Sequence, residues 1–182
     1  NRIYIFRKNK FLDLADPGFN RPSKIRTIIA ADFDNDGYDE VFINNIGQSN
    51  KLFKIKENGI LEEIDLKQAS LPEGFGTGAA VADIDGDGVL ELLISHGEGR
   101  KQALKLFKAN INRERSYLRI RPINSHNAPA RGATVTLKSN LRVHSKTIDA
   151  GSGYLCQMEP VAHFGIRKKE KNIEIIIKWT DG

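Results

Sequence analysis

The chain contains an internal repeat at a spacing of 51 residues, and this repeat constrains its fold more than any other feature. Residues 26–45 (RTIIAADFDNDGYDEVFINN) align with residues 77–96 (TGAAVADIDGDGVLELLISH), with seven identities in 20 positions. In each copy, segments of small, β-branched and aromatic residues flank a loop rich in Asp and Gly, which indicates two strands and a turn. Repetition at this period is typical of propellers and solenoids, in which each unit packs against its neighbour.

Each unit has the size of one propeller blade. Four strands in about 50 residues match a four-stranded blade, with a solenoid as the structural alternative. Asn58-Gly59 predicts a tight hairpin at the end of the first unit. Because two blades cannot close a ring, we expect a part of a longer propeller. The strands expected in this part of the chain cover residues 1–6, 26–31, 40–44, 50–56, 60–64, 78–82 and 90–95.

The repeat stops after about residue 110, and a different strand pattern begins. Further strands are expected at residues 116–120, 134–138, 141–148 and 173–179, and only residues 62–69 carry a weak helical pattern. We therefore predict an all-β protein. Residues 1–110 form the blades of a partial β-propeller, and residues 111–182 form a small β-sandwich-like domain that is incomplete at its C-terminus.

The Asp-rich loop of each repeat carries the clearest chemistry. Loop 1 is residues 32–40 (DFDNDGYDE) and loop 2 is residues 83–91 (DIDGDGVLE). Carboxylates at alternate positions repel one another, so a compact loop needs a cation, and Ca²⁺ suits it because it takes about 6–8 oxygen ligands in flexible geometry. We predict one calcium ion in each loop. The predicted side-chain ligands are Asp32, Asp34, Asp36 and Glu40 in loop 1 and Asp83, Asp85, Asp87 and Glu91 in loop 2, with the backbone carbonyls of Tyr38 and Val89.

Other interpretations of the loops fit less well. An EF-hand needs a Glu at position 12 and flanking helices, whereas position 12 here is Ile43 or Ile94 between strand-like segments. Mg²⁺ prefers strict octahedral geometry and retained waters. Catalytic carboxylate pairs need differing environments, but these loops repeat one arrangement. A metal-free turn stabilised by Asp side chains stays open as the structural alternative.

The two parts of the chain resemble two known kinds of module. The loops, with the glycine-rich residues 74–80, resemble the FG-GAP/VCBS repeats of integrin-α-like β-propellers. Residues 149–165 (DAGSGYLCQMEPVAHFG) and 178–182 (KWTDG) resemble the ASPIC/UnbV domain. The combination resembles the cartilage acidic protein family. The chain departs from the family pattern at the end of each loop, which is Glu rather than Asp, and at Arg167 and Thr180.

The resemblance implies a secreted or cell-surface, calcium-stabilised module for protein interaction or adhesion, without catalysis. Its partner would be a receptor or a matrix component. Two alternatives stay open: the propeller and accessory domain of a secreted or biosynthetic enzyme, with chemistry at Cys156 or His163, or a carbohydrate- or polyanion-binding module. We interpret His163 as a packing and hydrogen-bonding residue and Cys156 as a buried free thiol.

The charge of the chain is unevenly distributed. The net charge is +5, but residues 1–110 hold 15 basic and 17 acidic side chains, whereas residues 111–182 hold 13 basic and 6 acidic ones. Because residues 111–182 are basic, binding of a polyanionic ligand stays open as an alternative. Its strongest basic run, residues 167–171, is interpreted as a solvated hairpin turn, and it lacks the interleaved aromatic residues of a single-strand nucleic-acid platform. No apolar run reaches the roughly 18 residues that a membrane helix needs.

Overall fold

The computed structural model describes residues 1–182 except residues 16, 57–59, 112–114, 150, 152 and 181–182. Its described segments are strands and loops, with a single 3₁₀ turn, η1 (Lys67–Ser70), as the helical exception. The all-β prediction is therefore confirmed. In the described part of the chain, no helix combines the length and the apolar character that crossing a membrane requires.

The first repeat forms a four-stranded antiparallel blade in chain order. Its strands are β3 (Ile25–Ala31), β4 (Glu40–Asn45), β5 (Lys51–Ile55) and β6 (Leu61–Ile64). Loop 1 connects β3 to β4, whose facing ends are the pair Ala31 and Glu40. The predicted Asn58-Gly59 hairpin lies outside the described residues. The weak helical pattern at residues 62–69 corresponds to the end of β6 followed by η1.

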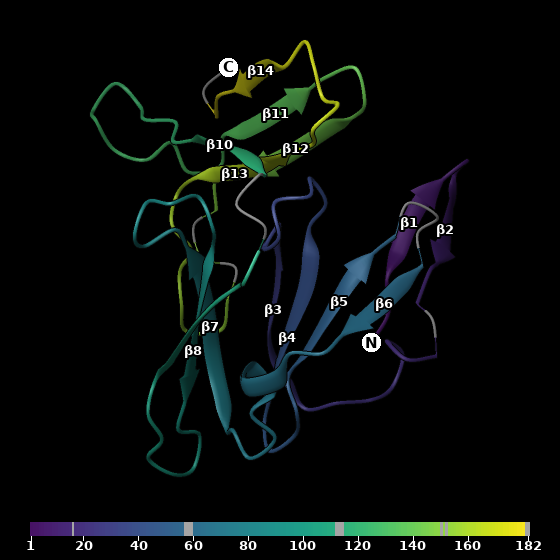
Figure 1. Cartoon of the computed structure of the whole chain (residues 1–182), viewed down its shortest axis with the longest axis vertical. Helices are drawn as coiled ribbons and strands as arrows, with labels where there is room; N and C mark the ends of the chain where they lie inside the picture. The colour runs from purple at the N-terminus through teal and green to yellow at the C-terminus, as the bar shows by residue number, and fades with distance from the viewer. Residues whose placement is uncertain (16, 57–59, 112–114, 150, 152, 181–182) are drawn as a thin grey trace.

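The second repeat forms a blade with three strands in its described residues. These are β7 (Gly76–Ala82), β8 (Glu91–His96) and β9 (Lys105–Lys108). Loop 2 connects β7 to β8, where Ala82 pairs with Glu91 in the position that Ala31 and Glu40 hold in the first blade. The first strands of the two blades, β3 and β7, contact each other (Figure 1).

A third, separate sheet precedes the repeat. It is the hairpin of β1 (Tyr4–Arg7) and β2 (Lys10–Asp13). The strand expected over residues 1–6 is therefore present but begins at Tyr4 and ends at Arg7. The described residues thus hold several sheets that do not close into a ring, as a partial propeller requires.

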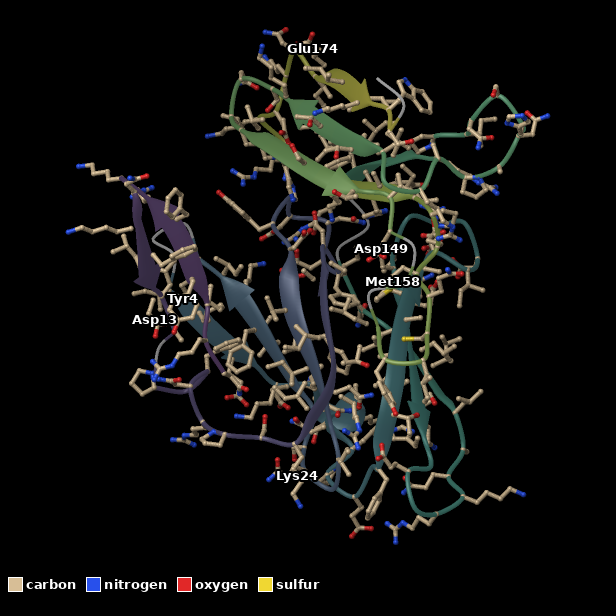
Figure 2. All side chains as sticks on the ribbon, turned by 180° about the vertical axis from the view of Figure 1, so that it is seen from behind. Tyr4, Asp13, Lys24, Asp149, Met158 and Glu174 are labelled. Atoms are coloured by element: carbon tan, nitrogen blue, oxygen red, sulfur yellow. The ribbon has the colours of Figure 1, made fainter. Side chains whose placement is uncertain are left out.

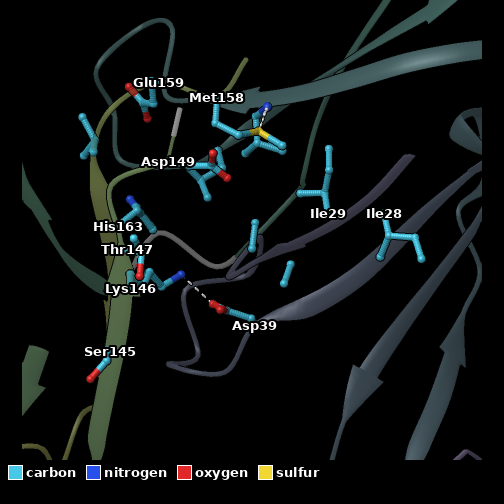
Figure 3. Close-up of a pocket in the computed structure, with 15 residues that line it drawn as sticks. Ile28, Ile29, Asp39, Ser145, Lys146, Thr147, Asp149, Met158, Glu159 and His163 are labelled. Atoms are coloured by element: carbon cyan, nitrogen blue, oxygen red, sulfur yellow. Dashed lines mark hydrogen bonds and ion pairs between the residues drawn. The ribbon is translucent and has the colours of Figure 1, made fainter. Parts of the chain in front are cut away.

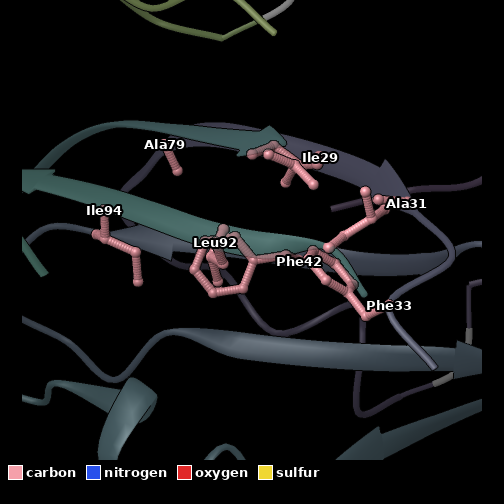
Figure 4. Packing of buried hydrophobic residues seen from close by; sticks show 9 residues of the cluster. Ile29, Ala31, Phe33, Phe42, Ala79, Leu92 and Ile94 are labelled. Carbon is pink, nitrogen blue, oxygen red and sulfur yellow. The ribbon is translucent and has the colours of Figure 1, made fainter. Parts of the chain in front are cut away.

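Apolar side chains from both blades form the core between them. Alternate residues of β3 are buried, as expected for a strand that packs on one face. Ile29 and Phe42 of the first blade meet Ala79, Leu92 and Ile94 of the second, and each of these five is at most 6% exposed (Figure 4). Burial of this shared core fixes the position of one blade, and of its loop, relative to the other.

The C-terminal part contains two facing sheets. One pairs β10 (Ser116–Ile120) with β13 (Ala162–Ile166), and the other has the order β12 (Val143–Thr147), β11 (Thr134–Lys138), β14 (Glu174–Lys178). Apolar side chains from both sheets share one core. The arrangement is a small sandwich that lies over the loop ends of the blades (Figure 1).

The structure corrects the interpretation of residues 167–171. β13 and β14 belong to different sheets, so this segment crosses between sheets and is not a hairpin turn. It is also not fully solvated, because the Arg167 guanidinium lies 3.8 Å from the ring centroid of Tyr38 and Glu170 is buried against Arg142. Local sequence predicts strands but not which strands pair, and the prediction failed on that point.

Candidate metal centres

The first carboxylate of each loop organises the backbone of that loop. Oδ1 of Asp32 accepts a hydrogen bond from the N–H of Asp36 at 3.0 Å, and Oδ2 accepts one from Gly37 at 2.8 Å. In loop 2, Oδ2 of Asp83 accepts the equivalent bond from Gly88 at 3.0 Å. Gly37 and Gly88 have φ angles of +88° and +81°, which glycine adopts without strain. The predicted glycine turn is present in both loops.

The other carboxylates of loop 1 predicted as ligands each use one oxygen to bind the backbone. Oδ1 of Asp34 accepts the N–H of Asp36 at 3.0 Å, and Oδ1 of Asp36 accepts that of Tyr38 at 2.9 Å. Oε2 of Glu40 accepts the N–H of Phe33 at 2.9 Å. The second oxygen of each carboxylate is left for a cation.

Loop 2 repeats this pattern but is more open to solvent. Asp87 accepts the N–H of Val89 at 2.9 Å, and Glu91 accepts that of Ile84 at 2.7 Å. The side chains of Asp85 and Asp87 are 59% and 47% exposed, against 31% and 22% for their counterparts in loop 1. Loop 1 is therefore the more enclosed of the two sites.

The carboxylates gather into two triads, and in each triad one oxygen from every member lies within 4.8 Å of the others. The triads are Asp32, Asp34 and Asp36 in loop 1, and Asp83, Asp85 and Glu91 in loop 2. Burial raises the pKa of Asp32 to about 6, and burial together with the charge of Asp34 raises that of Glu40 to about 8. A cation would offset this accumulation of negative charge. Clustered hard oxygen donors on a flexible loop fit Ca²⁺.

A lysine ammonium lies among the carboxylates of each loop. Nζ of Lys54 lies 2.6 Å from Oδ2 of Asp34 and 2.5 Å from Oδ2 of Asp36. Nζ of Lys108 lies 2.7–2.8 Å from three carboxylates of loop 2. Although burial lowers it, hydrogen bonds to Asp34 and Asp36 hold the pKa of Lys54 above its ordinary value. Both cages therefore bind positive charge in this structure.

The two triads hold six of the eight predicted side-chain ligands, and Glu40 and Asp87 lie in the same loops outside them. Ligation by these carboxylates stays a prediction. Tyr38 and Val89 contribute backbone N–H groups to these loops, and ligation by their carbonyls stays a prediction. Sequence reasoning missed Lys54 and Lys108, because both lie on later strands. The signal that could have found them is the hairpin register, which places a lysine opposite the last residue of each loop.

Loop 1 also contacts the C-terminal sandwich through β13. The backbone N–H of Gly165 donates to Oδ2 of Asp32 at 2.9 Å, and Nε2 of His163 lies 2.7 Å from Oδ1 of Asn35. Nδ2 of Asn35 donates to the carbonyl of Gly88 in loop 2 at 2.7 Å. Asn35 is 2% exposed. One buried side chain therefore joins both loops and the sandwich, and His163 has the hydrogen-bonding role that the sequence predicted.

Basic side chains of the sandwich meet acidic side chains of the blades. Ion pairs across this boundary include Arg115–Asp34 at 2.8 Å, Arg119–Asp83 at 2.8 Å and Lys146–Asp39 at 2.7 Å (the last in Figure 3). Nε2 of His144 also lies 3.5 Å from Oδ2 of Asp39. Although burial raises it, contacts with His144 and Lys146 lower the pKa of Asp39 to about 2. The opposite charges of the two halves are thus complementary where the halves meet.

Residues 153–159 extend from the sandwich along the first strands of the blades. Sγ of Cys156 donates to the carbonyl of Ala79 at 2.7 Å, and the N–H of Val81 points at the sulfur of Met158 at 3.2 Å (Figure 3). Figure 2 shows Met158 beside the ribbon of β7. Cys156 is half-buried, whereas the sequence predicted a buried thiol. The segment ties the sandwich to the face of the blades that β3 and β7 form.

The comparisons with known proteins divide the chain in the same way. Residues 32–94 match the family model of the FG-GAP-like repeat, and residues 123–182 match that of ASPIC and UnbV. The chain is 46% identical over 184 aligned residues to cartilage acidic protein 1 of Mus musculus, and it is equally similar to the proteins of that name from Homo sapiens and Xenopus tropicalis. These alignments cover 96% of the chain and 28% of the length of each relative.

Proposed function

Because the chain is a homologue of the cartilage acidic proteins that joins an FG-GAP-like repeat to an ASPIC/UnbV domain, we propose that it is a calcium-stabilised, non-catalytic protein-interaction module that works outside the cell or at its surface. The observation that carries this proposal is the pair of carboxylate cages built on the two triads. Each cage closes the connection between the first two strands of a blade. A bound ion would therefore stabilise the blade against opening.

In this proposal, one Ca²⁺ is held in loop 1 and one in loop 2 by the eight carboxylates and the two backbone carbonyls predicted from the sequence. Calcium supplies charge neutralisation and cross-linking of the loop. Side chains of the chain shape the loops themselves. Asp32 and Asp83 fix the backbone turn, and Glu40 and Glu91 connect the start of the second strand to the loop. The ions are structural, so their loss weakens the blades.

The contacts of the two candidate catalytic residues support a non-catalytic module. A nucleophilic thiol needs an adjacent base, but Sγ of Cys156 is hydrogen-bonded to the carbonyl of Ala79. A catalytic histidine needs access to a substrate, but His163 is 4% exposed and its Nε2 is engaged by Asn35. Both side chains hold the sandwich on the blades.

We further propose that residues 1–110 and residues 111–182 are two domains that act as one rigid unit. Three ion pairs, the bridging Asn35 and the segment of residues 153–159 fix their contact. A rigid surface suits a receptor or a matrix protein as partner, because little entropy is lost when it binds. The interface already neutralises Arg115, Arg119 and Lys146, which weakens the case for a polyanion.

The calcium part of the proposal is tested by thermal unfolding of the full chain after chelation and at saturating calcium. A ligand that binds the native state alone raises the melting temperature. We expect calcium to raise it in the wild type and to raise it less in the double variant Asp34→Asn/Asp85→Asn. The control Asp65→Asn, outside both loops, should respond like the wild type. Identical melting with and without calcium would overturn the structural role of the ion.

The interaction part is tested with a panel of receptor ectodomains and matrix proteins, probed with the full chain in calcium and in chelator. We expect saturable binding to at least one of them that is weakened by chelation. Turnover of a small-molecule or peptide substrate that His163→Gln or Cys156→Ser abolishes, with no binding in the panel, would favour the enzyme instead.

A further inference from the structure

Lys54 and Lys108 occupy the same structural position in the two blades. Glu91 pairs with Lys108 across β8 and β9. In the first blade, Val41 pairs with Phe53, and continuing this register by one residue places Lys54 opposite Glu40. Each lysine is therefore the cross-strand neighbour of the Glu that ends a loop. The repetition of this pairing in both blades indicates a shared role.

Each ammonium group contacts two of the three carboxylates of the triad in its loop. Nζ of Lys54 is within 2.6 Å of Oδ2 of both Asp34 and Asp36, the oxygens that the backbone leaves free. Nζ of Lys108 is 2.7 Å from Oε1 of Glu91. Calcium binds carboxylate oxygens at about 2.3–2.6 Å. An ammonium group and a calcium ion therefore cannot occupy the same cage together.

The lysines can leave the cages without unfolding the blade. Their side chains are 25% and 31% exposed, so one side of each already faces solvent. A lysine has a flexible four-carbon stem that can keep its apolar contacts while the head moves into water. Exchange of an ammonium group for a calcium ion thus needs only a change of lysine rotamer.

We propose that Lys54 and Lys108 are internal counter-cations that fill the two loops when calcium is absent, and that calcium must displace them to bind. They set the calcium affinity of the loops and preserve the blades in its absence. This inference rests on the proposed calcium function. Its consequence is a pair of weak, reversible sites that respond to changes in calcium concentration.

The test uses the variants Lys54→Met and Lys108→Met, which keep the aliphatic stem and remove the charge. Lys51→Met and Lys105→Met, on the same two strands but outside the cages, are the matched controls. Calorimetric titration with calcium should show affinity at least about ten-fold tighter in the first two variants, because a competing unit charge is removed from beside the ion. The controls should bind like the wild type.

Thermal unfolding provides a second readout, because the change in melting temperature caused by each lysine variant should differ between chelator and saturating calcium. In chelator, Lys54→Met and Lys108→Met should melt below the wild type, because their carboxylates lose a counter-charge. In saturating calcium, they should melt at or above it. A lysine with a merely structural role would lower the melting temperature in both conditions. Lys54→Gln serves as a second variant in case Lys54→Met does not fold.

The outcomes separate the two proposals. If the wild type binds calcium and the cage variants bind it no more tightly, the lysine inference is overturned and the calcium function stands. If only the cage variants bind calcium, the lysines exclude the ion instead of yielding to it, so their counter-cation role stands while the displacement and the calcium function of the wild type fail. If neither the wild type nor any variant binds, both proposals fail.

Discussion

The backbone N–H of Gly165 donates a 2.9 Å hydrogen bond to Oδ2 of Asp32, the first carboxylate of loop 1. The same oxygen accepts the N–H of Gly37, which shapes the loop itself. In loop 2, the equivalent oxygen of Asp83 binds the Arg119 guanidinium. Both candidate metal loops are therefore held from outside by the C-terminal sandwich, so the integrity of the loops and the docking of the sandwich depend on each other.

The close approach at Gly165 predicts that Gly165→Ala destabilises the chain. A Cβ at this position would lie 2.4 Å from Oδ2 of Asp32 and 2.5 Å from the backbone of Asn35. We expect a loss of about 2–3 kcal/mol in the free energy of unfolding, since overpacking forces the backbone apart. Denaturant unfolding measures it. A loss under about 0.5 kcal/mol, as for an ordinary surface substitution, would refute the close contact.

The bridging role of Asn35 predicts a large effect of Asn35→Ala. The variant leaves the carbonyl of Gly88 and the ring of His163 without their partner inside the interface. We expect a loss of about 2–4 kcal/mol, because each buried group left unsatisfied costs about 1–3 kcal/mol. Asn127→Ala is the control, since Asn127 has a similar φ of +60° but lies exposed. A loss no larger than in the control would contradict the bridge.

His163 is neutral in the folded chain, and we therefore predict that its protonation at low pH reduces the stability of the fold. Nδ2 of Asn35 donates to Gly88, so its Oδ1 accepts, and Nε2 of a neutral His163 carries the hydrogen. Burial, with the charges of Lys146 and Arg119, lowers the pKa of His163 to about 4. The unfolded state therefore binds more protons between pH 4 and about 6.5, and stability present above pH 6.5 is lost as the pH falls through this window.

Chemical unfolding across that pH range measures the effect. Compared with His163→Gln, which retains a donor for Asn35, the wild type should lose up to about 3 kcal/mol more stability as the pH falls through this window. The raised pKa values of Asp32 and Glu40 act in the opposite direction, but these groups are present in both proteins. His126→Gln changes an exposed histidine and should leave the dependence as in the wild type. An equal dependence in the wild type and in His163→Gln would show that other groups cause it.

Arg119 joins two carboxylates at the boundary between sandwich and blades. We therefore predict that its loss destabilises the chain more than the loss of an exposed ion pair does. Arg119 contacts Asp83 at 2.8 Å and Glu159 at 2.5 Å, and the Asp83 side chain is 1% exposed. We expect Arg119→Met to cost about 2–3 kcal/mol, because it leaves a buried carboxylate without its partner. Lys138→Met removes an exposed pair with Glu174 and should cost under about 1 kcal/mol. Comparable losses in urea unfolding would contradict the bridge.

The sequence was most informative where the structure is local and repeated. The spacing of 51 residues and the alternation of carboxylates predict the blades, both loops and the six carboxylates that gather in the two triads. The sequence does not predict β13, because residues 162–166 include a glycine. That glycine is needed for the approach to Asp32, which a linear pattern does not reveal.

The contacts between distant residues could not be predicted in the same way. Asn35 and His163 are 128 residues apart, and their hydrogen bond depends on how the sandwich lies on the blades. The charge asymmetry of the two halves was visible in the sequence, but the ion pairs it produces were not. Predicting that Lys54 and Lys108 lie beside the loops requires the strand register of each blade. Pairing between strands, rather than composition, decides these parts of the site.

The most direct test is a crystal structure of the full chain grown with calcium, with anomalous scattering used to locate the ions. We expect one calcium peak in each loop, about 2.3–2.6 Å from the carboxylate oxygens, with the ammonium groups of Lys54 and Lys108 displaced into solvent. Loops without a peak at millimolar calcium, with both lysines still in their cages, would contradict the calcium-stabilised module.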